Sequence, residues 1–494
     1  MVLLGDQSRS RAVGICCAGV ALRIGLALSG LQPTLASAME LVVSSTSWER
    51  AQEGYFLGTL GLSHYAGGVF SGSPLMLAAV AFCATLPAAV QTLAAAILFT
   101  GVDLASALLL RAICVRAVAV ESGDWETQLE DWMDEDSKPP TVPGLVSSPS
   151  SKSSRGGHTN GSPTRDDGAA WNLPDVVLAV YLLNPVIAGQ CAALSGDVLG
   201  RVLPLAALAA AGSGRPGVTA AALAAAACLW RFHAAPLLLP AALMLGTSSC
   251  GAGGDGATSG SGALFDPRYF ELDGRALLRL SVGFLAWCAA ILGACWVATS
   301  GSWAFLGAAA KGQLLCENLT PNIGLYWYFF AELFPRFRGF FRVLFLSQPY
   351  VYVLPATLRL GMFPEALASL LLAIFGLFQP YPTMADPMLA GCLFLCHPRT
   401  SARMRLVIPV GMAALVPSLL LPTMRHLWLQ AGTGNANFYY FQTVALNVLL
   451  AVFVLQFAAA LVKRRKALAV AFERRRKAGR GEAEAGGGGK ESER

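Results

Sequence analysis

The stretch PNIGLYWYFFAELFPRFRGFFR, residues 321–342, decides the fold class of this chain. It carries nine aromatic side chains, three arginines and a single carboxylate, Glu332. A water-soluble helix would have to bury that aromatic surface on every side. In a bilayer, aromatic rings favour the level of the lipid headgroups, and an acidic residue at membrane depth marks a functional requirement. The stretch therefore predicts a membrane protein.

Composition extends this prediction to the whole chain. Of its 494 residues, 55% are hydrophobic and 13% are charged, whereas globular domains average about 25% charged residues. Apolar runs of about 20 residues, the length that crosses a bilayer, recur from end to end. We predict an all-α, polytopic membrane helical bundle with about 10–12 spans, several of them broken by proline or glycine.

Charge predicts the orientation of the bundle. Basic residues precede the first apolar run and follow the last one, at 463–480, and the net charge is +6. Basic segments that flank membrane spans face the cytosol, so both termini are expected there. Because the basic tail directly follows a span, we do not expect a nucleic-acid partner.

Four regions follow from these patterns. Residues 1–120 hold the N-terminal spans and a first luminal loop at 32–73. Residues 121–170 form an acidic and then Ser/Gly/Pro-rich linker, expected to be cytosolic and partly disordered. The membrane core occupies 171–462, and 463–494 form a basic cytosolic tail.

Two span boundaries are expected inside apolar runs. Segments 74–98 and 101–120 are expected to be separate, because Thr100-Gly101-Val102-Asp103 interrupts the run. The aromatic stretch is expected to span the membrane at 323–346, with a break near Pro335 that frees backbone carbonyl groups.

The segment GTGNANF, residues 432–438, opens the last long span. Asn437 is well placed to cap that helix. The two amides of Asn435 and Asn437 also offer donors and acceptors that suit sugar hydroxyls and phosphate oxygens, and a helix N-terminus adds partial positive charge. Both residues are therefore predicted to bind a lipid headgroup.

Three further residues are weaker candidates for lipid or headgroup contact. Glu332 forms an ion pair with Arg336, four residues on, or else contacts a headgroup or a partner subunit. Tyr381 lies in the Pro-rich break at 379–383, which indicates either a membrane cavity or an interfacial turn. Arg359 ends an apolar segment, where it either snorkels to the interface or contacts a lipid phosphate.

No catalytic constellation stands out. Glu49 and Glu53 in the first loop would share one face of a helix, but the loop has no aspartate and so lacks the D-x-D metal motif of lipid-sugar-dependent glycosyltransferases. Cys392, Cys396 and His397 have no second ligand pair at a suitable spacing. We therefore predict no catalytic residue, no metal and no cofactor.

Several stretches, in this order, resemble the PIG-U family, membrane subunits of the glycosylphosphatidylinositol (GPI) transamidase. The most specific is LTPNIGLYWYFFAELFPRFRGFF at 319–341. The others are SWERAQEG (47–54), LGLSHYAGGVFSGSPL (60–75), VVLAVYLLNPVIAG (176–189), FQPYPTMAD (378–386) and RHLWLQAGTGNANFYY (425–440). The linker at 121–170, the Gly/Ser loop near 250 and the C-terminal tail have no clear counterpart, and Thr433 and Gly434 vary the family's loop.

The resemblance implies a protein of the endoplasmic reticulum with a core like that of class C glycosyltransferases, without their catalytic acids. It implies a non-catalytic subunit that helps the complex bind the GPI lipid, at Asn435 and Asn437. Acyl transfer would be performed by a separate caspase-like subunit, PIG-K, alongside PIG-S, PIG-T and the GPI anchor attachment protein.

Two other functions stay open. A GPI- or dolichol-linked mannosyltransferase of the same architecture would rely on Glu49 and Glu53. A transporter ranks lower, because the chain shows no obvious internal repeat and few charges inside apolar runs. Asn160 and Asn318 begin formal glycosylation acceptors; the first is expected to be cytosolic and unmodified, the second luminal.

Overall fold

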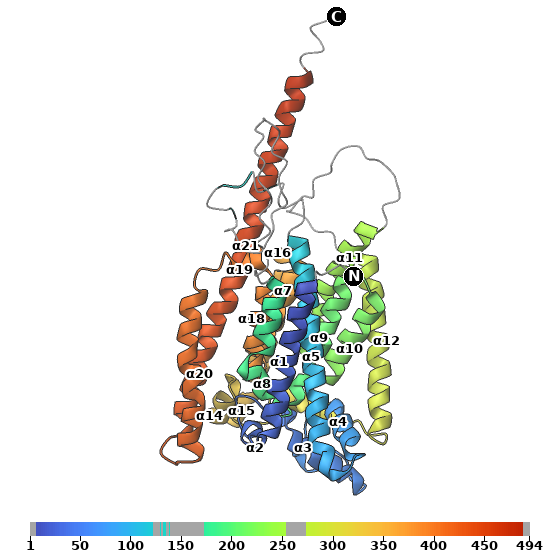
Figure 1. Ribbon diagram of the computed structural model, residues 1–494, viewed down its shortest axis with the longest axis vertical. Coiled ribbons are helices and arrows are strands. Elements are labelled where there is room, and N and C mark those ends of the chain that lie inside the picture. Colours follow the sequence, from blue (N-terminus) through green and yellow to red (C-terminus); the bar gives the residue numbers. More distant parts are fainter. Residues whose placement is uncertain are drawn as a thin grey trace, which may run out of the picture.

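The chain folds into a helical bundle, from one end of which the C-terminal helix projects (Figure 1). The computed structural model describes residues 6–121, 129, 132–134, 138, 172–252 and 273–487. Throughout those residues the regular structure is helical and no strand occurs, which confirms the predicted all-α polytopic class.

The helices vary widely in length. The first half of the chain contains α1 (Asp6–Leu28), α2 (Gln32–Ala36), α3 (Trp48–Thr59), α4 (Pro74–Ala84), α5 (Ala88–Glu121), α7 (Leu173–Leu182), α8 (Pro185–Ala192), α9 (Gly196–Gly212), α10 (Pro216–Leu229) and α11 (Leu238–Ala252). The second half contains α12 (Gly274–Ala298), α13 (Ala304–Gln313), α14 (Tyr326–Glu332), α15 (Pro335–Val351), α16 (Val353–Leu360), α17 (Pro364–Phe378), α18 (Ala385–Leu395), α19 (Pro398–Ser401), α20 (Val407–Leu429) and α21 (Ala436–Gly487).

Within the described ranges, five helices are long and apolar enough to cross a bilayer, namely Ser8–Leu28, Ala88–Glu121, Gly274–Ala298, Val407–Leu429 and Ala436–Ala478. The pair α7 and α8, bent by 48°, makes a sixth if it is counted as one span. The other apolar helices have 10–17 residues. At about 1.5 Å per residue these fall short of a hydrocarbon core of about 30 Å, so they cover its depth only in part.

The bend between α7 and α8 has a local cause. Pro185 is the first residue of α8 and cannot donate a backbone hydrogen bond to α7. Asn184 caps α8, because its side-chain oxygen accepts from the N–H groups of Val186 at 2.9 Å and Ile187 at 3.3 Å. One Asn-Pro pair thus ends one helix and begins the next.

Helix α5 runs without a break through the predicted split near Gly101, so the expectation of two separate segments is wrong. One glycine inside a helix costs only about 1 kcal/mol relative to alanine. Asp103 is fully buried, and its charge is tolerated because it pairs with Arg23 of α1 at an N···O distance of 2.7 Å. Contacts with α1, α7 and α9 hold α5 along this length.

The aromatic stretch is not one continuous span, which corrects the expectation for 323–346. Helix α14 ends at Glu332 and α15 begins at Pro335, the residue predicted to cause a break. Both helices lie at the end of the bundle opposite the projecting part of α21 (Figure 1).

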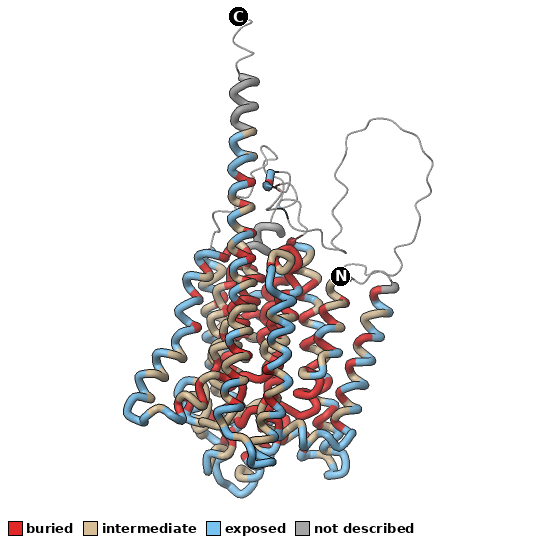
Figure 2. Tube along the Cα trace, turned by 90° about the vertical axis from the view of Figure 1, so that its left-hand side faces the viewer, coloured by how far each residue is buried: buried red, intermediate tan, exposed pale blue. Residues whose placement is uncertain are grey.

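Buried residues concentrate inside the bundle, whereas its outer helices expose one face (Figure 2). On α12 and α20 the exposed side chains are apolar, for example Leu285, Ile408 and Leu419. Such a surface suits lipid or another membrane subunit rather than water. The start of α1 and the far end of α21 point to the same end of the bundle (Figure 1).

Candidate functional site

Helix α14 carries the centre of the aromatic stretch and packs against α15 on one side. The ring centroid of Phe329 lies 5.7 Å from that of Phe341 and 5.2 Å from that of Phe345. Both pairs are edge-to-face, the geometry that ring quadrupoles favour, and such pairs contribute about 0.5–1.5 kcal/mol beyond burial. The break at Pro335 therefore lets the stretch fold back on itself.

On its other side α14 meets the hairpin of α20 and α21. Trp327 stacks on Trp428 of α20 at 6.3 Å between centroids, and Tyr328 stacks on Tyr440 of α21 at 4.6 Å. The Tyr440 hydroxyl group donates to the carbonyl oxygen of Leu325 at 3.0 Å. We call Trp327, Tyr328, Trp428 and Tyr440 the aromatic site. It joins two of the stretches that carry the family resemblance.

The predicted binding residues Asn435 and Asn437 lie beside the aromatic site. Asn437 is exposed, and its side-chain oxygen accepts a hydrogen bond from the Tyr328 hydroxyl group. Asn435, also exposed, caps α21, because its side-chain oxygen accepts from the N–H of Phe438 at 3.2 Å. The capping role predicted for Asn437 is therefore wrong, whereas the role of both amides in binding stays a prediction.

Glu332 is the last residue of α14 and lies next to the Tyr328 hydroxyl group. Arg336 belongs to α15, so the two residues do not share a helix. The expected ion pair between them is not formed in the described structure. Glu332 instead adds an exposed carboxylate to the edge of the aromatic site.

The two remaining candidates lie elsewhere. Tyr381 is buried, and its hydroxyl group donates to the carbonyl oxygen of Asn318 at 2.9 Å. It packs with Tyr326 and Phe330, behind α14. Arg359 is exposed on α16, near the opposite end of the bundle (Figure 1). Of the five predicted residues, Asn435, Asn437 and Glu332 thus lie at the aromatic site. Tyr381 lies behind it, and Arg359 is distant from it.

A buried series of charged and polar side chains, missed by the sequence analysis, crosses the bundle interior. Asp103 of α5 pairs with Arg23 of α1 and accepts a hydrogen bond of 2.7 Å from the Tyr181 hydroxyl group. Arg201 of α9 donates to the Tyr181 oxygen at 3.3 Å and to the side-chain oxygen of Gln190. All five side chains are buried.

The series continues into the Pro-rich break between α17 and α18. Gln190 donates to the Thr383 hydroxyl oxygen at 2.9 Å, and the Thr383 N–H donates to the Asp386 carboxylate at 2.8 Å. Arg231 completes it, with N···O distances of 3.7 Å to Asp386 and 2.5 Å to Asp197. We call these nine residues the polar network.

The polar network contains three arginines and three aspartates, so its formal charges balance. An isolated buried ion costs several kcal/mol in lost hydration, and only pairing and hydrogen bonds compensate for that cost. The signal was present in the sequence, because each charge interrupts an apolar run and an ionisable residue at membrane depth is a site candidate by default. The expectation of few intramembrane charges overlooked it.

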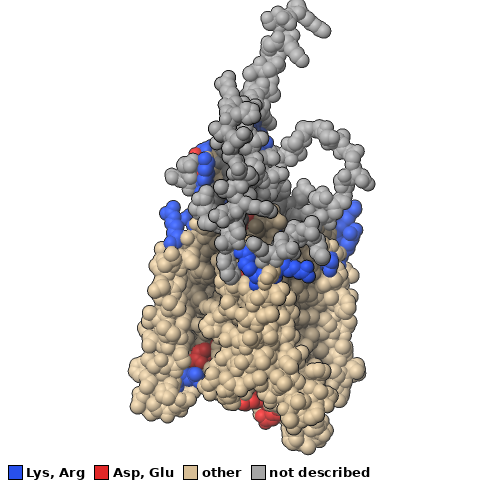
Figure 3. Space-filling view, viewed as in Figure 1, with Lys and Arg blue, Asp and Glu red and all other residues tan. Residues whose placement is uncertain are grey.

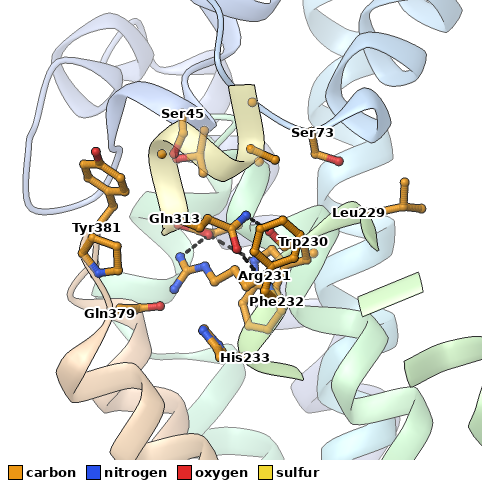
Figure 4. Close-up of a pocket in the computed structure, with 18 of the residues that line it drawn as sticks. Ser45, Ser73, Leu229, Trp230, Arg231, Phe232, His233, Gln313, Gln379 and Tyr381 are labelled. Carbon is orange, nitrogen blue, oxygen red and sulfur yellow. Dashed lines mark hydrogen bonds and ion pairs between the residues drawn. The ribbon is translucent and has the colours of Figure 1, made fainter. Parts of the chain in front are cut away.

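A cavity of about 110 Å³ borders the Arg231–Asp197 pair (Figure 4). Its walls come from the first loop, the start of α9, the connection between α10 and α11, helix α13 and the break at 379–381. Gln313 of α13 holds the connection between α10 and α11 in place, because it donates to the Trp230 carbonyl oxygen and accepts from the Phe232 N–H, each at 2.9 Å. Of the two readings of the Pro-rich break, the structure favours the cavity.

The two acids that a mannosyltransferase would need do not face this cavity. Glu49 and Glu53 are exposed on α3, and neither lines it. They share a face of one helix, as their spacing predicts. The carboxylate that borders the cavity belongs to Asp197, which pairs with Arg231.

Comparison with known proteins identifies the family. A family model described as GPI transamidase subunit PIG-U matches residues 17–446. The GPI-anchor transamidase component PIGU of Mus musculus is 37% identical over 147 residues, which cover 30% of this chain and 34% of that protein. The GPI transamidase component GAB1 homolog of Schizosaccharomyces pombe is 34% identical over 170 residues, 34% of this chain and 42% of that protein.

The GPI transamidase component GAB1 of Saccharomyces cerevisiae is 35% identical over 144 residues, 28% of this chain and 36% of that protein. The matched stretch therefore spans between a third and about two fifths of the length of these relatives. None of these names favours a mannosyltransferase. Since the family model matches most of the chain, from α1 into α21, the chain belongs to the PIG-U family.

Proposed function

We propose that this protein is a non-catalytic subunit of a GPI transamidase in the membrane of the endoplasmic reticulum, and that it binds the GPI lipid. Family membership supports the assignment to the complex. The observation that carries lipid binding is the aromatic site, where Tyr328 and the exposed Asn437 meet at one end of the bundle.

The chemistry of this region suits a glycolipid. Amide groups hydrogen-bond sugar hydroxyls and phosphate oxygens, and aromatic faces pack against the apolar faces of sugars. Four large aromatic side chains in the neighbouring segments are exposed: Phe334 between α14 and α15, Phe340 on α15, and Phe438 and Phe441 on α21. Aromatic rings at the membrane interface favour the headgroup level, so they would hold the boundary between glycan and acyl chains.

Charge supports an orientation with both termini in the cytosol. Lysine and arginine side chains gather at the end of the bundle from which α21 projects, whereas the flank that faces the viewer is nearly free of charge (Figure 3). By the positive-inside rule this end is cytosolic, and the aromatic site is then luminal. Luminal exposure suits assembly with PIG-K, PIG-S, PIG-T and the GPI anchor attachment protein, the partners implied by the family.

The test is the double variant Asn435→Ala, Asn437→Ala, expressed in cells that lack the native subunit. We expect less GPI attached to a reporter protein and accumulation of complete, unattached GPI, while the variant still co-purifies with the other subunits. Asn435→Asp separates the two roles of this residue, because aspartate keeps the helix cap but lacks the amide donor. Thr433→Ala, in the same exposed loop, controls for disturbance of the loop.

The same measurement separates the proposal from the enzyme alternative. Normal attachment in the double variant would contradict the proposed lipid site. Glu49→Gln with Glu53→Gln should leave GPI precursors complete. Truncated precursors that lack mannose in this variant would instead indicate a mannosyltransferase and overturn the proposed function.

A further inference from the structure

Another cavity lies where α21 leaves the bundle, and positive charge lines it. Its volume is about 430 Å³, within the range of about 300–1,000 Å³ that is typical of small-ligand sites. Ten described residues line it, and half of them are cationic: Lys138, Arg403, Arg405, Lys463 and Lys466. The single acid among these ten, Asp134, is bound by Arg474, which does not line the cavity. The described lining is therefore strongly positive.

Contacts within the fold fix the walls of this cavity. One wall carries Met133 and Asp134, a second is the connection from α19 to α20, and the third is one face of α21. Met133 and Met404 are buried in the main hydrophobic core, which anchors the first two walls. Arg474 of α21 donates to both carboxylate oxygens of Asp134, at 2.7 and 3.1 Å, and so joins the first wall to the third. These contacts hold the basic residues around one space.

The cavity lies at the boundary of the membrane. Arg405 stands two residues before α20, and Ile408, in the first turn of that helix, is 78% exposed. On α21 the apolar run ends at Val462, and Lys463 follows directly. Exposed apolar side chains that give way to basic ones mark the level of the lipid headgroups. A ligand in this cavity would therefore lie at headgroup level.

The charge of the lining favours an anion with several oxygen atoms. Cations that are held close together repel one another, and an anion between them removes that cost. Phosphate oxygens accept strong hydrogen bonds from guanidinium and ammonium groups. A phosphate monoester offers three acceptor oxygens and about two negative charges, whereas a carboxylate offers two oxygens and one charge. The monoester therefore matches five surrounding cations better.

We propose that this cavity binds the headgroup of an anionic phospholipid, with a preference for a phosphate monoester. Clusters of about four to eight Lys and Arg beside a membrane span attract such headgroups. An acidic peptide would meet the same charge, but the position of the cavity at headgroup level favours a lipid. Figure 1 shows α19 and the start of α20 at the opposite end of the bundle from α14. The inference is therefore independent of where GPI binds.

The experiment uses photocrosslinking of the full chain, purified with its accompanying subunits in mixed micelles of detergent and phosphatidylcholine. The probe is phosphatidic acid, whose headgroup is a phosphate monoester, with a diazirine in the acyl chain next to the glycerol. We expect labelling within 402–412 and 455–470. Unlabelled phosphatidic acid should compete strongly, and phosphatidylglycerol, whose phosphate is a diester, should compete less.

The double variant Arg405→Gln, Lys463→Gln tests the location. Both side chains are exposed, so the fold should tolerate the changes. We expect labelling to fall about tenfold, equivalent to about 1.4 kcal/mol of binding. Arg275→Gln with Arg279→Gln removes the same charge from exposed positions at the start of α12, outside the cavity, and should leave labelling unchanged. Arg405→Lys with Lys463→Arg keeps the charge and should keep the labelling.

Soluble competitors identify the source of the phosphate. Glycerol 3-phosphate carries the same monoester without acyl chains, and we expect it to compete far less than phosphatidic acid. Equal competition by glycerol 3-phosphate would indicate a soluble ligand, and stronger competition by heptaglutamate would indicate an acidic peptide. Either result would overturn the proposal. Equal competition by phosphatidylcholine, or an equal loss of labelling in the α12 double variant, would show unspecific attraction and would overturn it as well.

Discussion

Asp103 and its partners show why the sequence can mark single charges in apolar runs as candidates but cannot assemble them into the polar network. Arg23 and Asp103 are 80 residues apart, and Gln190 and Thr383 are 193 residues apart. Only the fold brings them together, so each charge in isolation reads as an irregularity in an apolar run. Asn435 could be singled out from the sequence, because its meaning lies in a short motif at a helix start.

Asp103→Asn should destabilise the bundle strongly. The change leaves Arg23 and Arg201 buried with one fewer negative charge, and removing one partner of a buried ion pair costs about 3–5 kcal/mol. The measurement is the free energy of unfolding in mixed micelles of detergent and dodecyl sulfate. Arg275→Gln, at an exposed position, is the control and should change it by less than about 0.5 kcal/mol. A small effect of Asp103→Asn would show that the network is hydrated.

Glu40 should make stability depend on pH. This residue of the first loop is buried, and burial raises its pKa although Arg425 lies 3.3 Å away. The folded state then holds the proton more tightly than the unfolded state, so stability is greatest below the ordinary glutamate pKa and is lost as pH rises through the raised value. We expect the melting temperature to rise from pH 7 to about 4.5. Glu40→Gln should reduce this rise, and Glu49→Gln, at an exposed site, should not.

Helix boundaries could be predicted where a single residue decides them. Pro335 begins α15 and Pro185 begins α8, because proline removes a backbone donor whatever surrounds it. The continuity of α5 through Gly101 could not be predicted, since packing against three neighbouring helices outweighs a weak local preference. The position of α14 could not be predicted either, because the residues that it packs against lie far away in the sequence, on α20 and α21.

Asn447 should hold the aromatic stretch in place. Its side-chain amide donates to the carbonyl oxygens of Ile323 and Thr443, each at 2.7 Å. Asn447→Leu would leave the buried Ile323 oxygen without that donor, at a cost of about 1–3 kcal/mol. We expect faster hydrogen exchange across 321–333, measured by mass spectrometry. Val448→Ala, on the exposed face of the same helix, is the control. Unchanged exchange in Asn447→Leu would contradict this anchoring role.

At the scale of the whole molecule, two features lie at opposite ends of the bundle. Basic side chains gather at the end from which α21 projects, and the aromatic site lies at the other end (Figures 1 and 3). The first feature was readable from composition, because the charge of flanking segments needs no tertiary structure. The second required the fold, which joins α14 to a hairpin about a hundred residues further on. In the proposed orientation, the basic end faces the cytosol and the aromatic site faces the lumen.

A new glycosylation acceptor tests this orientation directly. Gly61 lies in the first loop with φ of +76°, and an added Cβ would meet no atom within 4 Å. Asparagine tolerates this left-handed conformation better than most residues, and Gly61→Asn creates an acceptor with Leu62 and Ser63. We expect one added glycan, sensitive to endoglycosidase H and abolished by a further Ser63→Ala. The native acceptor at Asn160, outside the described residues, should stay unmodified; a glycan there, with none at position 61, would invert the orientation and move the aromatic site to the cytosol.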